Sequence, residues 1–294
     1  MNLDKSNKRN KRKTQRRMNC HPGMKGKTAS CNTCYTKNHL SRIKQAYNKN
    51  HPSKKINSNV PDSIINELRS KLECKKEDCW LKQLNKKERK SIDESVFAPD
   101  HPEKWKDNPT EWLSNYDILS VLQQYENTVN DFTFIGPTPI DFNSREGNSC
   151  VWPELCHIQL SNFISKKINK IGIIFNLDKH DESGSHWVSM FINIKEGIIF
   201  YFDSAVSKIP IEITDLVNLL LQQASILNIR MKYITNYPKQ HQTGDTECGM
   251  YSLYFIITML DNKKSMTTKI KLFQKKTITD KFVQTFRKEY FNTN

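Results

Sequence analysis

The chain has 294 residues, of which 36% are hydrophobic, and a formal net charge of +15 at pH 7. This length suffices for one full hydrophobic core and a smaller accessory region. No run of 18 or more apolar residues occurs, and the charged beginning, MNLDKSNKRNKRKTQRRMNC, lacks the apolar stretch of a secretion signal. These features argue against a membrane-spanning or secreted chain and predict a soluble, intracellular one.

Residues 1–28 are expected to form a basic, disordered tail. Residues 1–27 hold ten Lys or Arg and only one acidic residue, Asp4, so their net charge is +9 and +6 remains for the other 267 residues. Such a segment lacks the apolar periodicity needed for folding. A basic arm often contacts nucleic acid, but a solvated inert tail and a localisation signal remain open alternatives.

Residues 29–95 predict a helical accessory (arm) region. The stretches LSRIKQAYN, residues 40–48, and SIINELRSKL, residues 63–72, both have helical periodicity. In the second stretch, Ile64, Ile65, Leu68 and Leu72 line one face, and Pro61-Asp62-Ser63 supplies a helix start.

The chain has eight cysteines. Without a secretion signal, cysteines are more often free thiols, metal ligands or nucleophiles than a disulfide framework, which indicates a reducing compartment. Two close pairs could bind a structural zinc with help from neighbouring ligands: Cys31 with Cys34, Cys74 with Cys79, and Cys20 and His39 nearby. Their separation does not fit a standard zinc finger, so small buried thiols are the better interpretation. Cys150 and Cys156 have no evident role.

Residues 96–294 predict a second, larger domain. Four segments have the composition of strands: 171–177, 186–194, 197–203 and 231–237. The second and third are joined by KEG, which suits a tight hairpin. An amphipathic helix is predicted by the spacing of Ile213, Leu216, Val217, Leu220, Ala224 and Leu227. Residues 248–261 are apolar nearly all round, which predicts a buried helix and, with the strands, an α+β fold.

Cys248 lies at the start of this buried helix, in HQTGDTECGMYSLYFIITML, residues 241–260. A helix N-terminus beside an imidazolium favours the reactive thiolate form of a cysteine. Gly249 lets backbone and substrate approach closely because it has no Cβ. The segment therefore predicts a nucleophile.

A base and an orienting acid are expected from the predicted hairpin. His186 opens one strand and Asp203 ends the next, so the hairpin would return Asp203 toward the imidazole and hold it in one tautomer. Gln242, six residues before Cys248, could donate its amide to an oxyanion beside the Cys248 backbone N–H. Each residue also has an ordinary explanation, respectively a strand-edge histidine, a turn aspartate and a loop glutamine.

Together, SHW, FDS and QTGDTECGMY resemble the SUMO-protease and adenovirus-protease clan of cysteine peptidases. The chain order His, Asp, Gln, Cys is that of the clan, whereas papain-like enzymes have the order Gln, Cys, His, Asn. Within the clan, the chain is most similar to polyprotein-processing proteases of large cytoplasmic DNA viruses, of the African swine fever virus type, over roughly residues 30–290. Glu247 departs from the Asp of many SUMO proteases.

The resemblance implies a mixed central sheet packed against helices, a His186–Asp203–Cys248 triad, an oxyanion hole from Gln242 and Cys248, and no metal or organic cofactor. It also implies a narrow tunnel whose aromatic walls admit a small-residue segment such as Gly-Gly. Trp187 matches one wall. Trp112 resembles the other in a loosened pattern, and a core or surface aromatic is the alternative there.

The implied function is a cysteine endopeptidase that cleaves viral structural or core polyproteins, in the virion and the cytoplasmic virus factory of the host. One alternative is a SUMO or ubiquitin-like deconjugase, although obvious docking features for such proteins are lacking. A clan-related acetyltransferase would need acyl-CoA and inositol phosphate sites, which the sequence does not reveal. From a different class, the chain could be a nucleic-acid-binding virion protein with an inert protease domain.

Overall fold

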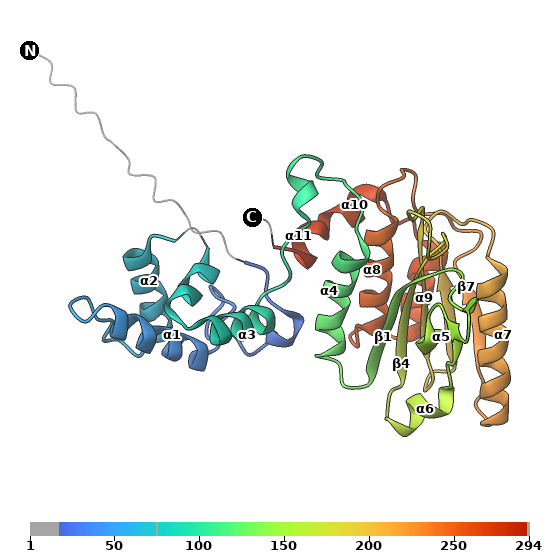
Figure 1. Ribbon diagram of the computed structural model, residues 1–294, viewed down its shortest axis with the longest axis horizontal. Coiled ribbons are helices and arrows are strands. Elements are labelled where there is room, and N and C mark those ends of the chain that lie inside the picture. The colour runs from blue at the N-terminus through green and yellow to red at the C-terminus, as the bar shows by residue number, and fades with distance from the viewer. Residues whose placement is uncertain (1–17, 75, 293–294) are drawn as a thin grey trace, which may run out of the picture. The chain divides into compact units, whose positions relative to one another are not determined.

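The computed structural model of the chain describes residues 18–74 and 76–292. They form two compact units, an accessory unit up to Phe97 and a sheet unit from Ala98 onward (Figure 1). The predicted basic tail lies outside the described residues up to residue 17. The prediction of disorder is wrong for residues 18–28, because Met18 and Met24 are buried and Cys20 is bonded to Cys34. These buried side chains and the disulfide attach the segment to the accessory unit despite its positive charge.

The accessory unit is helical, as the sequence predicts. Its elements are η1 (Pro22–Met24), α1 (Lys37–Asn50), α2 (Pro61–Leu72), η2 (Glu77–Gln83) and α3 (Lys86–Val96). The side chain of Thr36 caps α1 by accepting the backbone N–H of His39. Tyr35 stacks on Trp80 at the centre of its core, with ring centroids 5.8 Å apart.

The sheet unit combines strands with helices on both faces. Its helices are η3 (Glu103–Lys106), α4 (Asn115–Glu126), α5 (Pro153–Cys156), α6 (Leu160–Ser165), α7 (Ile211–Ile226), α8 (Cys248–Leu260), α9 (Met266–Lys275), α10 (Asp280–Thr285) and α11 (Arg287–Tyr290). Its strands are β1 (Phe132–Pro139), β2 (Arg145–Glu146), β3 (Ser149–Cys150), β4 (Lys170–Asn176), β5 (Trp187–Asn193), β6 (Ile198–Phe202) and β7 (Lys232–Thr235).

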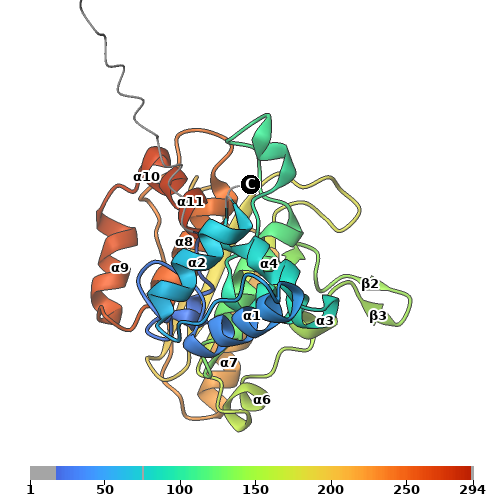
Figure 2. The same cartoon turned by 90° about the vertical axis from the view of Figure 1, so that its left-hand side faces the viewer.

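The central sheet has the order β1-β4-β5-β6-β7 and is mixed, with parallel pairs at both edges and antiparallel pairs between them. Figure 1 shows α4 and α8 on one side of the sheet and α7 on the other. Each face has its own hydrophobic core. The short hairpin of β2 and β3 extends away from this sheet (Figure 2). The prediction of an α+β fold with a mixed sheet is confirmed.

The four predicted strands correspond to β4, β5, β6 and β7, with ends shifted by one or two residues. The sequence analysis did not predict β1, which contains Gly136, Pro137 and Pro139 and reads as a loop. Proline is tolerated there because β1 is an edge strand whose register with β4 shifts between Ile135 and Thr138. The predicted amphipathic helix is α7, which ends just before Leu227.

Helix α8 is buried almost all round, as its apolar sequence predicts. It packs against β5 and α4. Its first residue, Cys248, belongs to the hydrophobic core on this face of the sheet. Among the described residues, no helix combines the length and hydropathy needed to cross a membrane.

Candidate active site

The β5–β6 hairpin brings His186 and Asp203 together. The two strands are antiparallel, with Ser189 opposite Phe202, so the residue before β5 and the residue after β6 lie at the same end of the hairpin. His186 Nε2 lies 2.7 Å from Asp203 Oδ1. The predicted pairing of imidazole and carboxylate is therefore present in the structure.

Asp203 is buried and held by backbone groups. Its Oδ1 also accepts the Ala205 N–H at 2.9 Å, and its Oδ2 accepts the Ser207 N–H at 2.7 Å. Burial alone would raise the pKa of Asp203, but its hydrogen bond and charge interaction with His186 and the two N–H donors lower it. Asp203 therefore stays ionised and faces the imidazole as an anion.

Asn236 is a positioning residue that the sequence analysis missed. Its Oδ1 accepts the Asp203 N–H at 3.0 Å, and its Nδ2 donates to the Asp203 carbonyl at 2.8 Å. This two-point contact fixes the backbone of Asp203 from the end of β7. An isolated Asn before Tyr237-Pro238 gives no signal of that contact in the sequence.

Cys248 is the first residue of α8, is a free thiol and has 1% of its surface exposed. Burial alone would lower the pKa of His186, but hydrogen bonds and charge interactions with Asp203 and Cys248 outweigh it and raise the pKa to about 9. The imidazole thus lies between the carboxylate and the thiol. This arrangement can hold a thiolate–imidazolium pair and transfer a proton to a leaving group.

Gln242 is buried beside this group. Its Oε1 accepts the Ser204 hydroxyl at 2.7 Å, and its Nε2 donates to the Gly244 carbonyl at 2.8 Å. The amide orientation is fixed by the Ser204 donor, and one N–H of the amide is left for another acceptor. Ser204 directly follows Asp203 in the chain, so the segment that carries the acid also binds the side chain of the predicted oxyanion donor, Gln242.

The two predicted wall tryptophans have different environments. Trp187 is buried and donates its indole N–H to the Leu113 carbonyl at 3.2 Å. Gly249 packs against both residues, since a Cβ there would lie 3.1 Å from Leu113 Cβ and 3.2 Å from Trp187 Cδ1. Trp112 is 36% exposed and is therefore not a buried wall residue. It directly precedes Leu113, the residue that contacts Trp187.

Trp187 lines a cleft of about 310 Å³, together with Trp152, Pro137 and Pro139. The cleft is also lined by His180. The sequence analysis missed Trp152 as a candidate wall residue. Its neighbours in the sequence, CVWPEL, have no periodicity that would separate a cleft tryptophan from a core tryptophan.

The cysteines considered as alternative zinc ligands do not form a group of three or more metal-ligand atoms in the described residues. Cys34 is bonded to Cys20, Cys74 is bonded to Cys79, and Cys31 is free and exposed. The expectation of free thiols is wrong for six of the eight cysteines, because chain folding brings their side chains into bonding distance.

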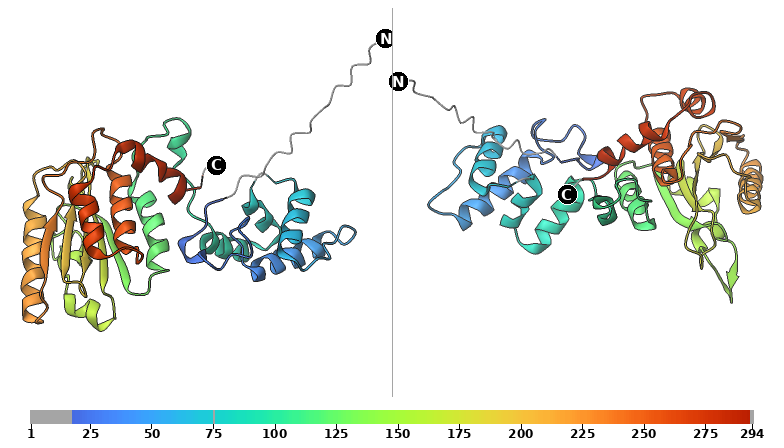
Figure 3. Two further views of the ribbon diagram at one scale, coloured as in Figure 1. Left: turned by 180° about the vertical axis from the view of Figure 1, so that it is seen from behind. Right: turned by 90° about the horizontal axis from the view of Figure 1, so that it is seen from above.

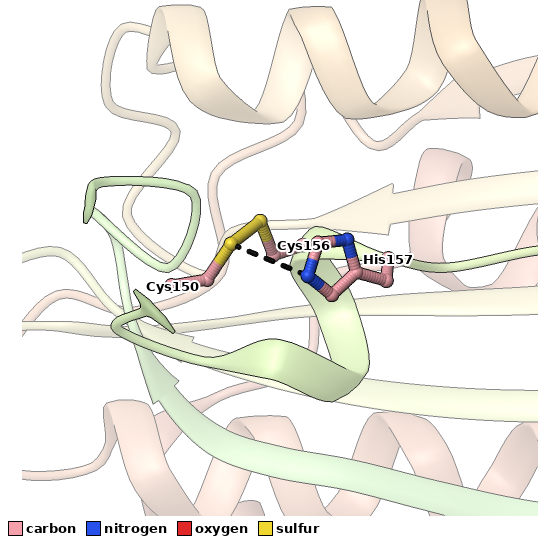
Figure 4. Close-up of side chains that lie close together, drawn as sticks. All are labelled: Cys150, Cys156 and His157. Carbon is pink, nitrogen blue, oxygen red and sulfur yellow. Dashed lines mark hydrogen bonds between the residues drawn. A yellow bond between two sulfur atoms is a disulfide. The ribbon is translucent and has the colours of Figure 1, made fainter. Parts of the chain in front are cut away.

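Among the described residues, only one group could offer three metal-ligand atoms close together, namely Cys150, Cys156 and His157 (Figure 4). The two sulfurs are bonded to each other, and His157 Nε2 lies 3.7 Å from Cys150 Sγ. As a disulfide, these sulfurs are not thiolate ligands. The bond instead joins β3 to α5, next to Trp152.

Comparison with known proteins shows which families and structures the chain is similar to. Residues 157–294 match the Ulp1 protease family, C-terminal catalytic domain. A protein of Acanthamoeba polyphaga mimivirus that bears the name of a thiol protease is 36% identical over 157 residues, which are 52% of this chain and 49% of the relative. A cysteine protease of African swine fever virus, from the Vero-adapted Badajoz strain, is 26% identical over 71% of this chain and 81% of the relative.

Among solved structures, a crystal structure of an African swine fever virus protease has a TM-score of 0.64 and 21% identity, covering 94% of this chain and 96% of that chain. This likeness shows a shared fold. The family match and the mimivirus relative make this part of the chain similar to cysteine peptidases. Residues 157–294, just under half of the chain, are thus similar to the Ulp1 protease family, and the chain spans about half the length of the mimivirus relative.

Proposed function

We propose that the chain is a cysteine endopeptidase that cleaves viral structural or core polyproteins after small residues of the Gly-Gly type. The observation that carries this proposal is the 2.7 Å hydrogen bond between His186 and Asp203, because the same imidazole also interacts electrostatically with Cys248 and Ser204 holds Gln242 nearby. A thiol, a base, an oriented acid and an amide donor are the groups that acyl transfer requires.

In the proposed mechanism, the Cys248 thiolate attacks the scissile carbonyl carbon while His186 holds the thiol proton. The Gln242 amide and the Cys248 N–H stabilise the oxyanion of the tetrahedral intermediate. His186 then gives its proton to the leaving amine, leaving an acyl-enzyme. Water, deprotonated by His186, attacks the acyl carbon and releases Cys248. Asp203 keeps the imidazole oriented throughout.

The preference for small residues is supported by the confined surroundings of the nucleophile. A Cβ at Gly249 would be tight against Leu113 and Trp187, and Trp187 also lines the adjacent cleft. A substrate segment without bulky side chains fits such a site. The proposed location is the virion and the host cytoplasm, where structural precursors are assembled.

The decisive experiment is incubation of the purified chain with candidate capsid precursors, followed by N-terminal sequencing of the products. New N-termini after small residues support endopeptidase activity, and Cys248→Ala should abolish them. A ubiquitin-like fusion with a Gly-Gly-X junction tests the rival deconjugase activity. Preferential cleavage of that fusion over every precursor would favour deconjugation.

We also propose that the basic N-terminal tail contacts nucleic acid. Residues 1–27 hold a net charge of +9, which suits binding to phosphates through counterion release. Deleting residues 1–17 should weaken nucleic-acid binding and reduce its salt dependence, while peptide cleavage persists. If the intact chain binds nucleic acid but cleaves no substrate, the alternative of a virion protein with an inert protease domain is supported instead.

A further inference from the structure

The loop that carries the proposed oxyanion donor, residues 241–247, is tied to the C-terminal segment Phe273–Arg287. Figure 3 shows this segment, in red, beside the orange-red α8, and α8 contacts both α9 and α10. The first tie is the buried imidazole of His241. Its Nε2–H donates to the Phe273 carbonyl at 2.8 Å, and its Nδ1 accepts the Ile278 N–H at 3.2 Å.

The second tie is Asp280, the first residue of α10. Its carboxylate accepts the Thr243 N–H at 3.1 Å, the Thr243 hydroxyl at 2.6 Å and the Gly244 N–H at 2.8 Å. The carbonyl of the same Gly244 accepts Gln242 Nε2 at 2.8 Å. Asp280 is therefore connected to the proposed oxyanion donor through a single residue.

Hydrogen bonding also favours the charged form of Asp280. Partial burial alone would raise its pKa, but donors on Thr243, Gly244 and Tyr251 outweigh burial and lower the pKa. The Tyr251 hydroxyl lies 2.9 Å from Asp280 Oδ1 and 2.7 Å from the Ile278 carbonyl. Because Tyr251 is one turn beyond Cys248 in α8, Asp280 joins the loop to the nucleophile's helix.

The third tie is a buried ion pair directly before the nucleophile. Arg287 Nε and Nη2 donate to Glu247 Oε2 at 3.1 and 3.0 Å, and Glu247 immediately precedes Cys248. Both side chains are buried, and the guanidinium carbon lies 4.3 Å from the ring centroid of Trp105.

The same guanidinium reaches the segment on the other side of the site. Its Nη1 donates to the Glu111 carbonyl at 2.8 Å, and its Nη2 donates to the Thr110 carbonyl at 3.2 Å. These residues lead directly to Leu113, whose carbonyl holds the Trp187 indole. The arginine reaches these three acceptors from three separate nitrogens, a spread that the single nitrogen of a lysine does not have.

We propose that the segment Phe273–Arg287 is a clamp that positions the catalytic groups, with Asp280 positioning Gln242 and Arg287 positioning both Cys248 and the Leu113–Trp187 wall. The inference rests on the roles proposed above for Gln242 and Cys248. Asp280 and Arg287 act through other residues and are positioning residues. A buried ion pair is weak evidence for stability, since desolvation offsets its attraction, whereas it fixes geometry well.

The test compares the kinetics and thermal stability of three variants of the full chain with a peptide substrate. Asp280→Asn replaces an acceptor by a donor facing the Thr243 and Gly244 N–H groups. We expect kcat to fall about 10- to 100-fold, because one misplaced oxyanion donor costs that much, with KM changed less than about threefold. Alkylation of Cys248 by iodoacetamide should keep its wild-type rate, because the amide oxygen of the substituted side chain can still accept the Tyr251 hydroxyl and preserve the contact with α8.

Arg287→Lys should give a different result. A single ammonium cannot hold Glu247 and both carbonyls, so the Glu247 carboxylate is left poorly paired next to the thiol. We expect kcat to fall about tenfold or more and the alkylation rate of Cys248 at pH 7 to fall as well. A KM increase is also expected, because the Leu113–Trp187 wall loses its support.

Lys269→Met is the matched control. Lys269 is buried and its Nζ donates to the Met259 and Asp261 carbonyls at the far end of α8, at 2.7 and 3.1 Å. Losing these bonds should lower Tm by as much as the clamp variants do, yet kcat should stay within about twofold of wild type. If Asp280→Asn does not fold, Thr243→Val removes only the hydroxyl bond, and a three- to tenfold loss of kcat is expected.

The outcomes separate the clamp from the proposed function. If Gln242→Ala retains full activity, the proposed oxyanion role itself fails. If Gln242→Ala loses about 100-fold while Asp280→Asn and Arg287→Lys keep kcat within twofold, the clamp is overturned. The clamp is also overturned if Lys269→Met loses as much kcat as they do at equal Tm, because the effect is then one of stability.

Discussion

Two histidine–carboxylate pairs in the sheet unit have nearly the same geometry. His186 Nε2 lies 2.7 Å from Asp203 Oδ1, and His180 Nδ1 lies 2.7 Å from Asp141 Oδ2. The pairs differ in their surroundings. The side chains of the first pair are 16% and 3% exposed, whereas those of the second are 35% and 10% exposed.

The main difference between the two pairs is a third side chain, the thiol of Cys248, which interacts with His186. Within the described part of the sheet unit, Cys248 is the only free thiol, and its interaction with His186 contributes to the raised pKa of the imidazole. His180 instead lines the cleft beside Trp187 and receives its orientation from Asp141, which also accepts the His180 N–H at 3.0 Å. The two pairs therefore share a short imidazole–carboxylate contact, and His186 differs in that it also interacts with a thiol.

Exchanging each imidazole for an amide should separate the two pairs most strongly. His186→Gln removes the proposed base and acid, so kcat/KM for a cleaved peptide should fall about 1,000-fold or more. His180→Gln should leave kcat within about threefold, with any effect confined to KM, because His180 faces the cleft and not the thiol. Equal losses of kcat in the two variants would show that His180 takes part in the chemistry.

The carboxylates should give the second largest contrast. Asp203→Asn removes the charge that orients and stabilises the His186 imidazolium, so kcat should fall about 100-fold or more. Asp141→Asn should change kcat less than about threefold. Steady-state kinetics with thermal melting of both variants checks this, since melting identifies a loss caused only by unfolding. A normal kcat in a folded Asp203→Asn protein would contradict the proposed triad.

The pH dependence sharpens the comparison further. The pKa of His186 is raised to about 9 by Asp203 and Cys248, despite burial. Stability from this interaction is therefore present below the ordinary histidine pKa of about 6.5 and is lost as the pH rises through about 9. Activity should fall over the same alkaline range, with an apparent pKa that belongs to the coupled His186–Cys248 pair.

Histidine NMR titration can follow this effect directly. In Cys248→Ala, the pKa of His186 should lie below that of the wild type, because a hydrogen bond and a negative charge have been removed. An unchanged His186 titration would mean that the thiol does not interact with the imidazole.

The two pairs also show what sequence reasoning can and cannot reach. The pairing of His186 with Asp203 was predictable because a tight hairpin defines which strand ends meet. The position of Cys248 at a helix start was predictable because the apolar run begins at this residue. Asp280 and Arg287 were not predictable. Asp280 lies 37 residues after Thr243, whose backbone it contacts, and Arg287 lies 40 residues after Glu247, its buried ion-pair partner. Hydrophobic periodicity within one element gives no signal of such long-range contacts.

The smallest expected effect concerns the packing that separates the proposed active site from the cleft. Gly249→Ala gains about 1 kcal/mol of helix propensity, but the added Cβ lies 3.1 Å from Leu113 Cβ and 3.2 Å from Trp187 Cδ1. Overpacking of a buried site typically costs about 1–3 kcal/mol, so the net loss should be about 0–2 kcal/mol.

Denaturant unfolding of Gly249→Ala, with Met250→Leu as the control, measures this balance. Met250 is buried one position further along α8, and a volume-conserving change there should cost less than about 1.5 kcal/mol. If the packing argument holds, kcat of Gly249→Ala falls as well, because Leu113 and Trp187 must move to admit the methyl group, while Met250→Leu retains kcat. If Gly249→Ala instead raises the free energy of unfolding by the full helix-propensity gain and keeps a normal kcat, Leu113 and Trp187 move aside without cost. The close packing at Gly249 could then not restrict the substrate to small residues.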